Sequence, residues 1–142
     1  MGRSPVHRTG VPYGLTREVH LPYEVADRRI REELAVQGFG ILTEIDVRDT
    51  LKKKLNVDFP PYVILGACNP SLAHRALDAE PDIGLLLPCN VVVRRDEEAG
   101  TTIVEAMDPA PLIELAGNEA LTEVAAEARA RLQTALDRVA AG

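Results

Sequence analysis

The hydrophobic positions of this chain follow two different spacings. Between residues 22 and 37 they recur at every fourth position from Ala26 to Leu34, which predicts a helix with one buried stripe. Between residues 39 and 47 they alternate with other side chains at every second position, which predicts a strand. Gly38 separates the two segments, and glycine is the residue that most easily adopts the left-handed conformation at a helix end.

The same reasoning along the whole chain predicts five strands and five helices. The predicted strands cover residues 15–20, 39–47, 62–68, 83–93 and 101–107, and Pro88 interrupts the fourth. The predicted helices cover residues 22–37, a short segment capped by Asp46, residues 70–79, a short segment that begins at Asp108-Pro109, and residues 118–140. We expect the short helix after Asp46 to direct Leu51 and Leu55 inward.

The order strand-helix-strand-helix-strand-helix-strand-strand-helix-helix predicts an α+β fold. A hairpin around residues 96–100 joins two successive strands, which excludes a purely parallel sheet. We therefore expect one small domain with a mixed β-sheet of about five strands packed with helices. Residues 1–12 are polar and interrupted by proline and glycine, which predicts a flexible N-terminal tail before a domain at residues 13–142.

Composition narrows the class of protein. The net charge of −6 argues against a nucleic-acid partner, because such affinity normally depends on cations that neutralise phosphates. Lys52-Lys53-Lys54 is then best interpreted as a solvated helix face. The N-terminus has no apolar core of a signal peptide and no stretch is long enough to cross a bilayer, so we expect a cytoplasmic protein without a membrane partner. Two cysteines are too few for a disulfide scaffold.

Both cysteines lie in similar short settings, Cys68-Asn69-Pro70 and Pro88-Cys89-Asn90. Asn69 is a favourable cap and Pro70 a favourable first residue of the following helix. A thiol at Cys68 would then lie near the positive end of the helix dipole, which favours the thiolate. If the two strands are neighbours, the thiols meet at one end of the sheet. The alternative is that both cysteines pack as small hydrophobic side chains.

These motifs resemble the DUF302 family, a family of unknown function. The resemblance lies in Gly66-Ala67-Cys68-Asn69-Pro70-Ser71-Leu72-Ala73, in the run from Pro81 to Val93 that contains Leu87-Pro88-Cys89-Asn90, and in Asp108-Pro109. It extends over about residues 15–140 and includes Gly38-Phe39, residues 44–47 and the helix from Asn118. The resemblance implies a small α+β fold, a homodimer and no established reaction.

Three functions remain open from the sequence. The first is a small-molecule-binding domain whose ligand is held by the residues of the cysteine motifs and the nearby acid: Cys68, Asn69, Pro88, Cys89, Asn90 and Asp108. The second is a thiol enzyme or redox sensor, with Cys68 as the nucleophile and Cys89 as the resolving thiol. The third is a purely structural dimer that associates through its terminal helix or a sheet edge.

A soft metal such as zinc or copper is a further alternative. Cys68 and Cys89 would be two of its ligands, with Asp108 or a histidine as the third. The spacing of these residues does not fix such a site, and the sequence names no cofactor.

Overall fold

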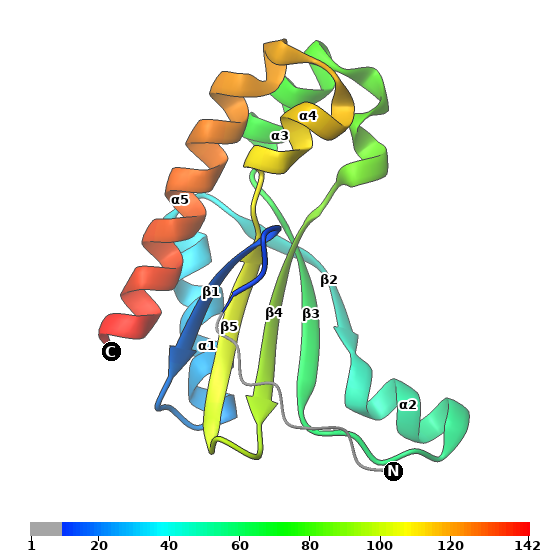
Figure 1. The fold of residues 1–142 in the computed structure, drawn as a ribbon, viewed down its shortest axis with the longest axis vertical. Coiled ribbons are helices and arrows are strands. Elements are labelled where there is room, and N and C mark those ends of the chain that lie inside the picture. Colours follow the sequence, from blue (N-terminus) through cyan, green and yellow to red (C-terminus); the bar gives the residue numbers. More distant parts are fainter. Residues whose placement is uncertain (1–9) are drawn as a thin grey trace.

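One antiparallel sheet organises residues 10–142, the residues that the computed structural model describes (Figure 1). Its strands in chain order are β1 (Gly14–Val19), β2 (Gly40–Asp46), β3 (Tyr62–Cys68), β4 (Cys89–Asp96) and β5 (Thr101–Met107). Their order across the sheet is β1-β5-β4-β3-β2, so β1 and β2 are the edge strands. The predicted α+β class and the five strands are confirmed.

The sheet differs from the predicted mixed sheet in one respect, because every neighbouring pair of strands is antiparallel. A parallel pair requires a crossover between neighbouring strands. The helix α1 (Tyr23–Val36) does link two strands that run in the same direction, β1 and β2. These two strands lie at opposite edges, however, and therefore never pair.

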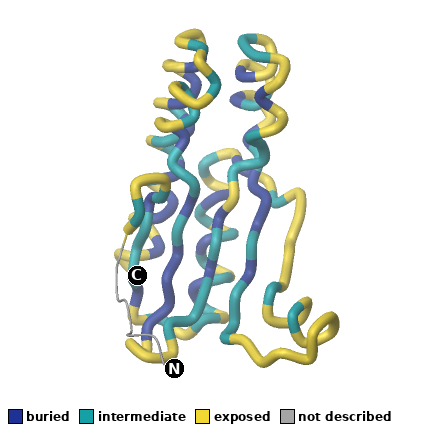
Figure 2. Tube along the Cα trace, turned by 45° about the vertical axis from the view of Figure 1, so that its right-hand side comes forward, coloured by how far each residue is buried: buried dark blue, intermediate teal, exposed yellow. Residues whose placement is uncertain are grey.

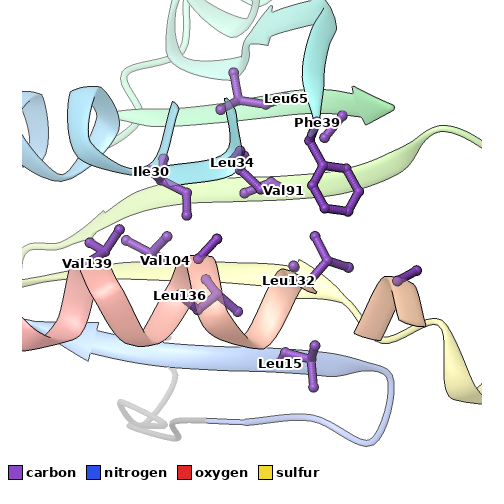
Figure 3. Close-up of a cluster of buried hydrophobic side chains, with 14 of the residues drawn as sticks. Leu15, Ile30, Leu34, Phe39, Leu65, Val91, Val104, Leu132, Leu136 and Val139 are labelled. Carbon is purple, nitrogen blue, oxygen red and sulfur yellow. The ribbon is translucent and has the colours of Figure 1, made fainter. Parts of the chain in front are cut away.

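Two helices cover one face of the sheet and close the core (Figure 3). The helix α1 contributes the predicted stripe at Ala26, Ile30 and Leu34. The helix α5 (Thr122–Ala141) packs against α1 and buries its own apolar stripe: Leu132, Ala135, Leu136 and Val139 among others. The strands bury alternate residues against these helices, as Val91 and Val93 do on β4.

The remaining helices lie at the two ends of the sheet (Figure 1). One end, which we call the helical end, carries α3 (Pro70–Ala79), the 3₁₀ helix η1 (Pro81–Leu86), α4 (Ala110–Ala116) and the 3₁₀ helix η2 (Glu119–Leu121). The helix α2 (Val47–Leu55) lies at the opposite end, after β2. The structure therefore separates α2 from the other helices.

The apolar run that begins at Ile83 is not a strand, contrary to the prediction for residues 83–93. Residues 81–86 form η1, and β4 begins at Cys89, after a cis peptide bond between Leu87 and Pro88. Glu80 caps η1 by accepting a hydrogen bond from the backbone N–H of Asp82. Short apolar runs without alternation do not distinguish a strand from a helical turn.

The prediction for α2 is half right. Asp46 caps the helix as expected, because its carboxylate accepts a hydrogen bond of 2.8 Å from the backbone N–H of Asp49. No residue of α2 is buried, however, and Leu55 is 67% exposed instead of pointing inward. Figure 2 shows this helix as an exposed segment at one corner of the molecule. Leu51 is half-buried, so the apolar side of α2 is only partly covered within residues 10–142.

The face of the sheet opposite α1 and α5 carries polar pairs. The carboxylate of Glu105 on β5 accepts a hydrogen bond of 2.9 Å from Thr16 and lies 3.4 Å from Arg94 Nε. Thr101 donates a hydrogen bond of 2.7 Å to Glu18 on the same face. Such alternation of apolar and polar positions is the usual pattern of an antiparallel sheet with one covered face.

Residues 1–9 of the predicted tail lie outside the described residues, so the predicted division at residue 12 stays a prediction. Within residues 10–142, none of the helices combines the length and the apolar character needed to cross a bilayer.

Candidate functional site

A cavity of about 380 Å³ lies at the helical end, between the ends of β3 and β4 and the helices α3, η1, α4 and α5. This volume is within the range of small-molecule pockets, about 300–1,000 Å³. Twenty residues line it and none of them is charged: Phe39, Leu42, Ala67, Cys68, Asn69, Leu72, Ala73, Ala76, Leu77, Ile83, Gly84, Leu87, Pro88, Cys89, Pro109, Leu112, Leu121, Val124, Ala125 and Ala128. The cavity is therefore almost wholly apolar.

Small side chains create the space. The helix α5 presents Ala125 and Ala128 to the cavity, and α3 presents Ala73 and Ala76. Larger side chains close its other sides, and two of them reach the surface. Leu42 is 67% exposed and Leu77 is 42% exposed, so the cavity opens to solvent beside β2 and α3.

The turn after α1 places Phe39 in the cavity. Gly38 has a φ of +87°, and the backbone N–H of Phe39 donates a hydrogen bond of 2.9 Å to the carbonyl of Leu34. This is the six-residue hydrogen bond of a Schellman motif, which brings the residue after the turn back against the helix. Phe39 is consequently buried at 4% exposure.

Asn69 connects three helices beneath the cavity. Its carbonyl oxygen accepts a hydrogen bond of 3.3 Å from the backbone N–H of Leu72, which caps α3. Its amide nitrogen donates a hydrogen bond of 3.3 Å to the carbonyl of Gln37 at the end of α1. Arg131 of α5 donates a hydrogen bond of 3.0 Å to the same carbonyl. Both ends of the Asn69 amide are therefore used within the fold.

Both thiols line the cavity. Ala67 pairs with Cys89 across β3 and β4, so Cys68 is one residue away from Cys89 in register, and both cysteines line the cavity. Both are free thiols. Burial, and to a smaller extent the neighbouring Cys68, raises the pKa of the Cys89 thiol from 9.0 to about 11. Cys89 is thus protonated at neutral pH.

A glycine allows the strands to approach each other closely here. A Cβ atom on Gly66 would overlap the Thr43 side chain and would lie 2.9 Å from Cγ of Pro88. The side chain of Pro88, next to Cys89, is therefore packed over Gly66. Gly66 of β3 thus provides the surface on which Pro88 packs.

The structure brings together four of the six predicted ligand-binding residues: Cys68, Asn69, Pro88 and Cys89. Asn90 is exposed and does not line the cavity, because it points to the opposite face of β4 from Cys89 and Val91. Asp108 does not line it either. Its carboxylate accepts hydrogen bonds from the backbone N–H of Ala110 (2.9 Å) and from Nε of Arg129 (3.0 Å).

Sequence reasoning missed the sides of the cavity formed by Phe39, Leu42 and α5. The signal that was available is the pair of alanines, Ala125 and Ala128, within the apolar stripe of the terminal helix. Small residues in such a stripe leave space unless a neighbouring element fills it.

The described residues offer no third ligand for a metal ion beside Cys68 and Cys89. Within residues 10–142, no three His, Cys, Asp or Glu side chains are grouped so that they could hold a metal ion. Cys68 and Cys89 alone do not provide the four ligands typical of a structural zinc site.

The fold and the cavity define a small α+β domain with an apolar pocket between the end of its sheet and a set of short helices. The chain belongs to the DUF302 family, "Domain of unknown function DUF302", whose model matches residues 15–139.

A solved structure of the same family is closely similar. It is an uncharacterised conserved DUF302 protein from Bacillus stearothermophilus, with 35% sequence identity and a TM-score of 0.83. The alignment covers 91% of this chain and 99% of the other. The comparison with curated proteins found no match.

Proposed function

We propose that this domain binds a small, uncharged and largely apolar molecule in the cavity at its helical end. The observation that carries the proposal is the cavity of about 380 Å³ without a charged side chain in its lining. A charged ligand would lose its hydration there without gaining an opposite charge. An apolar ligand instead gains from the removal of its surface from water.

Binding is favoured over acid–base catalysis by the chemistry of the lining. Asn69 has the only polar side chain there apart from the two thiols, and its amide already hydrogen-bonds to Leu72 and Gln37. Cys89 is held protonated by burial, which raises its pKa to about 11. General acid–base catalysis needs a group whose pKa lies near the working pH.

The Cys89 thiol would contribute contact rather than charge. A protonated thiol is a weak hydrogen-bond donor with a polarisable sulfur, and it packs well against apolar and aromatic groups. We therefore expect Cys68 and Cys89 to give the ligand a soft contact surface between the aliphatic sides of the cavity.

The test uses 1-aminoanthracene, a neutral aromatic dye whose fluorescence rises when it leaves water. We expect saturable binding to the wild type and at least a tenfold loss of affinity in Ala128→Leu. Ala128 lines the cavity and is 8% exposed, so a leucine there would occupy the ligand space.

Ala130→Leu is the matched control, since Ala130 lies on the same helix and faces solvent. It should bind the dye as the wild type does. Equal binding by all three proteins, or no saturable binding by the wild type, would show that the cavity is not a ligand site.

Thiol chemistry is a second candidate, favoured by the position of both cysteines on one cavity. Two thiols and one hydrogen peroxide would give one disulfide and two waters. The raised pKa of Cys89 opposes the second step at neutral pH, in which the Cys89 thiolate would attack the oxidised sulfur of Cys68. Mass spectrometry after peroxide treatment tests this reaction. A mass loss of two hydrogens in the wild type that is absent from Cys89→Ser would support a redox role. We propose the cytoplasm as the compartment of the protein.

A further inference from the structure

The helix α4 differs from the other helices that line the cavity. Among the described residues, α3, α5, η1 and η2 each bury at least one side chain, whereas α4 buries none. It lies at the helical end, where it packs chiefly against α5 and η2 (Figure 1). Its residue Leu112 nevertheless lines the cavity. One wall of the cavity is therefore a helix that is itself only lightly packed.

Two residues fix the ends of α4. Asp108, before the helix, accepts a hydrogen bond of 3.0 Å from Nε of Arg129 on α5. Asn118, after the helix, donates a hydrogen bond of 2.9 Å to the carbonyl of Ala79 at the end of α3. Within the described chain, the hydrogen bonds of residues 109–117 go to partners in the same segment or to Asp108 and Asn118. The helix is thus tied at its two ends and not along its length.

The chain has conformational freedom where α4 ends. Gly117 has a φ of +65°, and a Cβ atom there would meet no other segment within 4 Å. Glycine adopts positive and negative φ values with similar ease, so the direction of the chain can change at this residue. Movement of α4 about Gly117 separates the partly buried Ile113 and Ala116 from the core. It breaks apolar contacts but no hydrogen bond to another element.

We propose that α4 is a movable wall of the cavity, and that Leu112 sets the length of ligand that fits before this wall moves. The second part rests on the proposed binding function, because it concerns the ligand of that site. The first part stands without a ligand. A ligand that displaces α4 replaces the contacts of Ile113 and Ala116 with apolar contacts of its own, so little apolar surface is returned to water.

Hydrogen exchange of the ligand-free wild type tests the first part. The helix α3 is the matched control, because it is also a short cavity-lining helix at the helical end, but it buries Leu72 and Ala76. We expect the amides of α4 to exchange on the order of ten times faster than those of α3, after correction for the intrinsic rates of their sequences. Equal corrected rates would overturn the movable wall.

A series of straight-chain alcohols from hexanol to dodecanol tests the second part by displacement of 1-aminoanthracene. The affinity of the wild type should rise about fourfold with each added methylene and stop rising at the length that brings the chain against Leu112. In Leu112→Ala this limiting length should increase by about two to three carbons, because the alanine lacks the outer carbons of the leucine side chain.

Leu115→Ala is the matched control for this change. Leu115 lies on the same helix, is 70% exposed and does not line the cavity. Its limiting length should equal that of the wild type, and circular dichroism confirms that both variants fold. The same limiting length in the wild type and both variants would refute the role of Leu112 and leave the binding of the dye standing.

Hydrogen exchange with alcohol present joins the two parts. Alcohols below the limiting length should slow the exchange of α4, because they add contacts to Leu112. Longer alcohols should accelerate it, because they bind only when α4 is displaced. Absence of that acceleration would contradict the movable wall. A wild type that binds neither dye nor alcohol would refute the proposed function and the role of Leu112, whereas exchange without ligand would still decide whether α4 moves.

Discussion

Gly66 lies at a position where neighbouring segments leave no room for a side chain. A Cβ atom there would overlap Thr43 and would lie 2.9 Å from Pro88. Relief of that overlap requires movement of either β2 or the segment before β4. We expect Gly66→Ala to lower the free energy of unfolding by about 1–3 kcal/mol, measured by urea denaturation.

Gly84→Ala is its matched control. A Cβ atom on Gly84 would meet no atom within 4 Å, and its backbone φ is not positive. Its free energy of unfolding should stay within about 0.5 kcal/mol of the wild type. Similar losses in both variants would mean that crowding at Gly66 is not the cause.

The Cys89 thiol provides a prediction about pH. Burial and the neighbouring Cys68 raise its pKa to about 11, so the reactive thiolate is scarce at pH 8 and increases up to pH 11. In a Cys68→Ser variant, Cys89 should react with iodoacetamide on the order of ten times more slowly at pH 8 than an exposed cysteine in a peptide. Its rate should still rise through pH 9.5. A plateau near pH 8.5 would contradict the raised pKa.

Both cysteines of the predicted site line the cavity, but only one of the two asparagines that follow them does. Cys68-Asn69 ends a strand and starts a helix, so its asparagine turns into the cap beneath the cavity. Cys89-Asn90 begins a strand, where successive side chains point to opposite faces. The repeated Cys-Asn step therefore has a different geometry in each setting, and the sequence alone does not distinguish them.

At the scale of elements, Asn69 provides the contact that joins α1, α3 and α5. It caps α3 through Leu72 and donates to the Gln37 carbonyl that Arg131 also binds. Asn69→Ala should lower the free energy of unfolding by about 1–3 kcal/mol, because a cap and a largely buried hydrogen bond are lost together.

Asn90→Ala is the matched control for this change. Asn90 is exposed, and its loss should alter the free energy of unfolding by less than about 0.5 kcal/mol. Urea denaturation at equal protein concentration compares the two variants. Equal stability of both would contradict the role of Asn69 in holding the helices together.

Hydrophobic spacing predicted where most helices lie, but it did not predict which apolar sides are buried. The stripes on α1 and α5 are buried because the sheet and each helix cover the other. Leu51 and Leu55 have the same helical spacing, yet α2 has no buried residue. A spacing defines an apolar side, whereas burial depends on a neighbour that the spacing does not specify.

At the scale of the whole molecule, burial differs strongly between the centre and the corner of the fold. β4 lies between β5 and β3 and carries Val91 and Val93 at 0% exposure. The helix α2 and most of β2 are exposed at the edge. Regions with few buried contacts open with a small free energy, and central strands open only when the whole domain unfolds.

Hydrogen exchange makes this difference in stability measurable in the wild type. The amides of α2 should open with about 1–2 kcal/mol, and those of β4 near the global free energy of unfolding. Protection of α2 as strong as that of β4 would contradict this expected difference, because it would mean that α2 opens only when the whole domain unfolds.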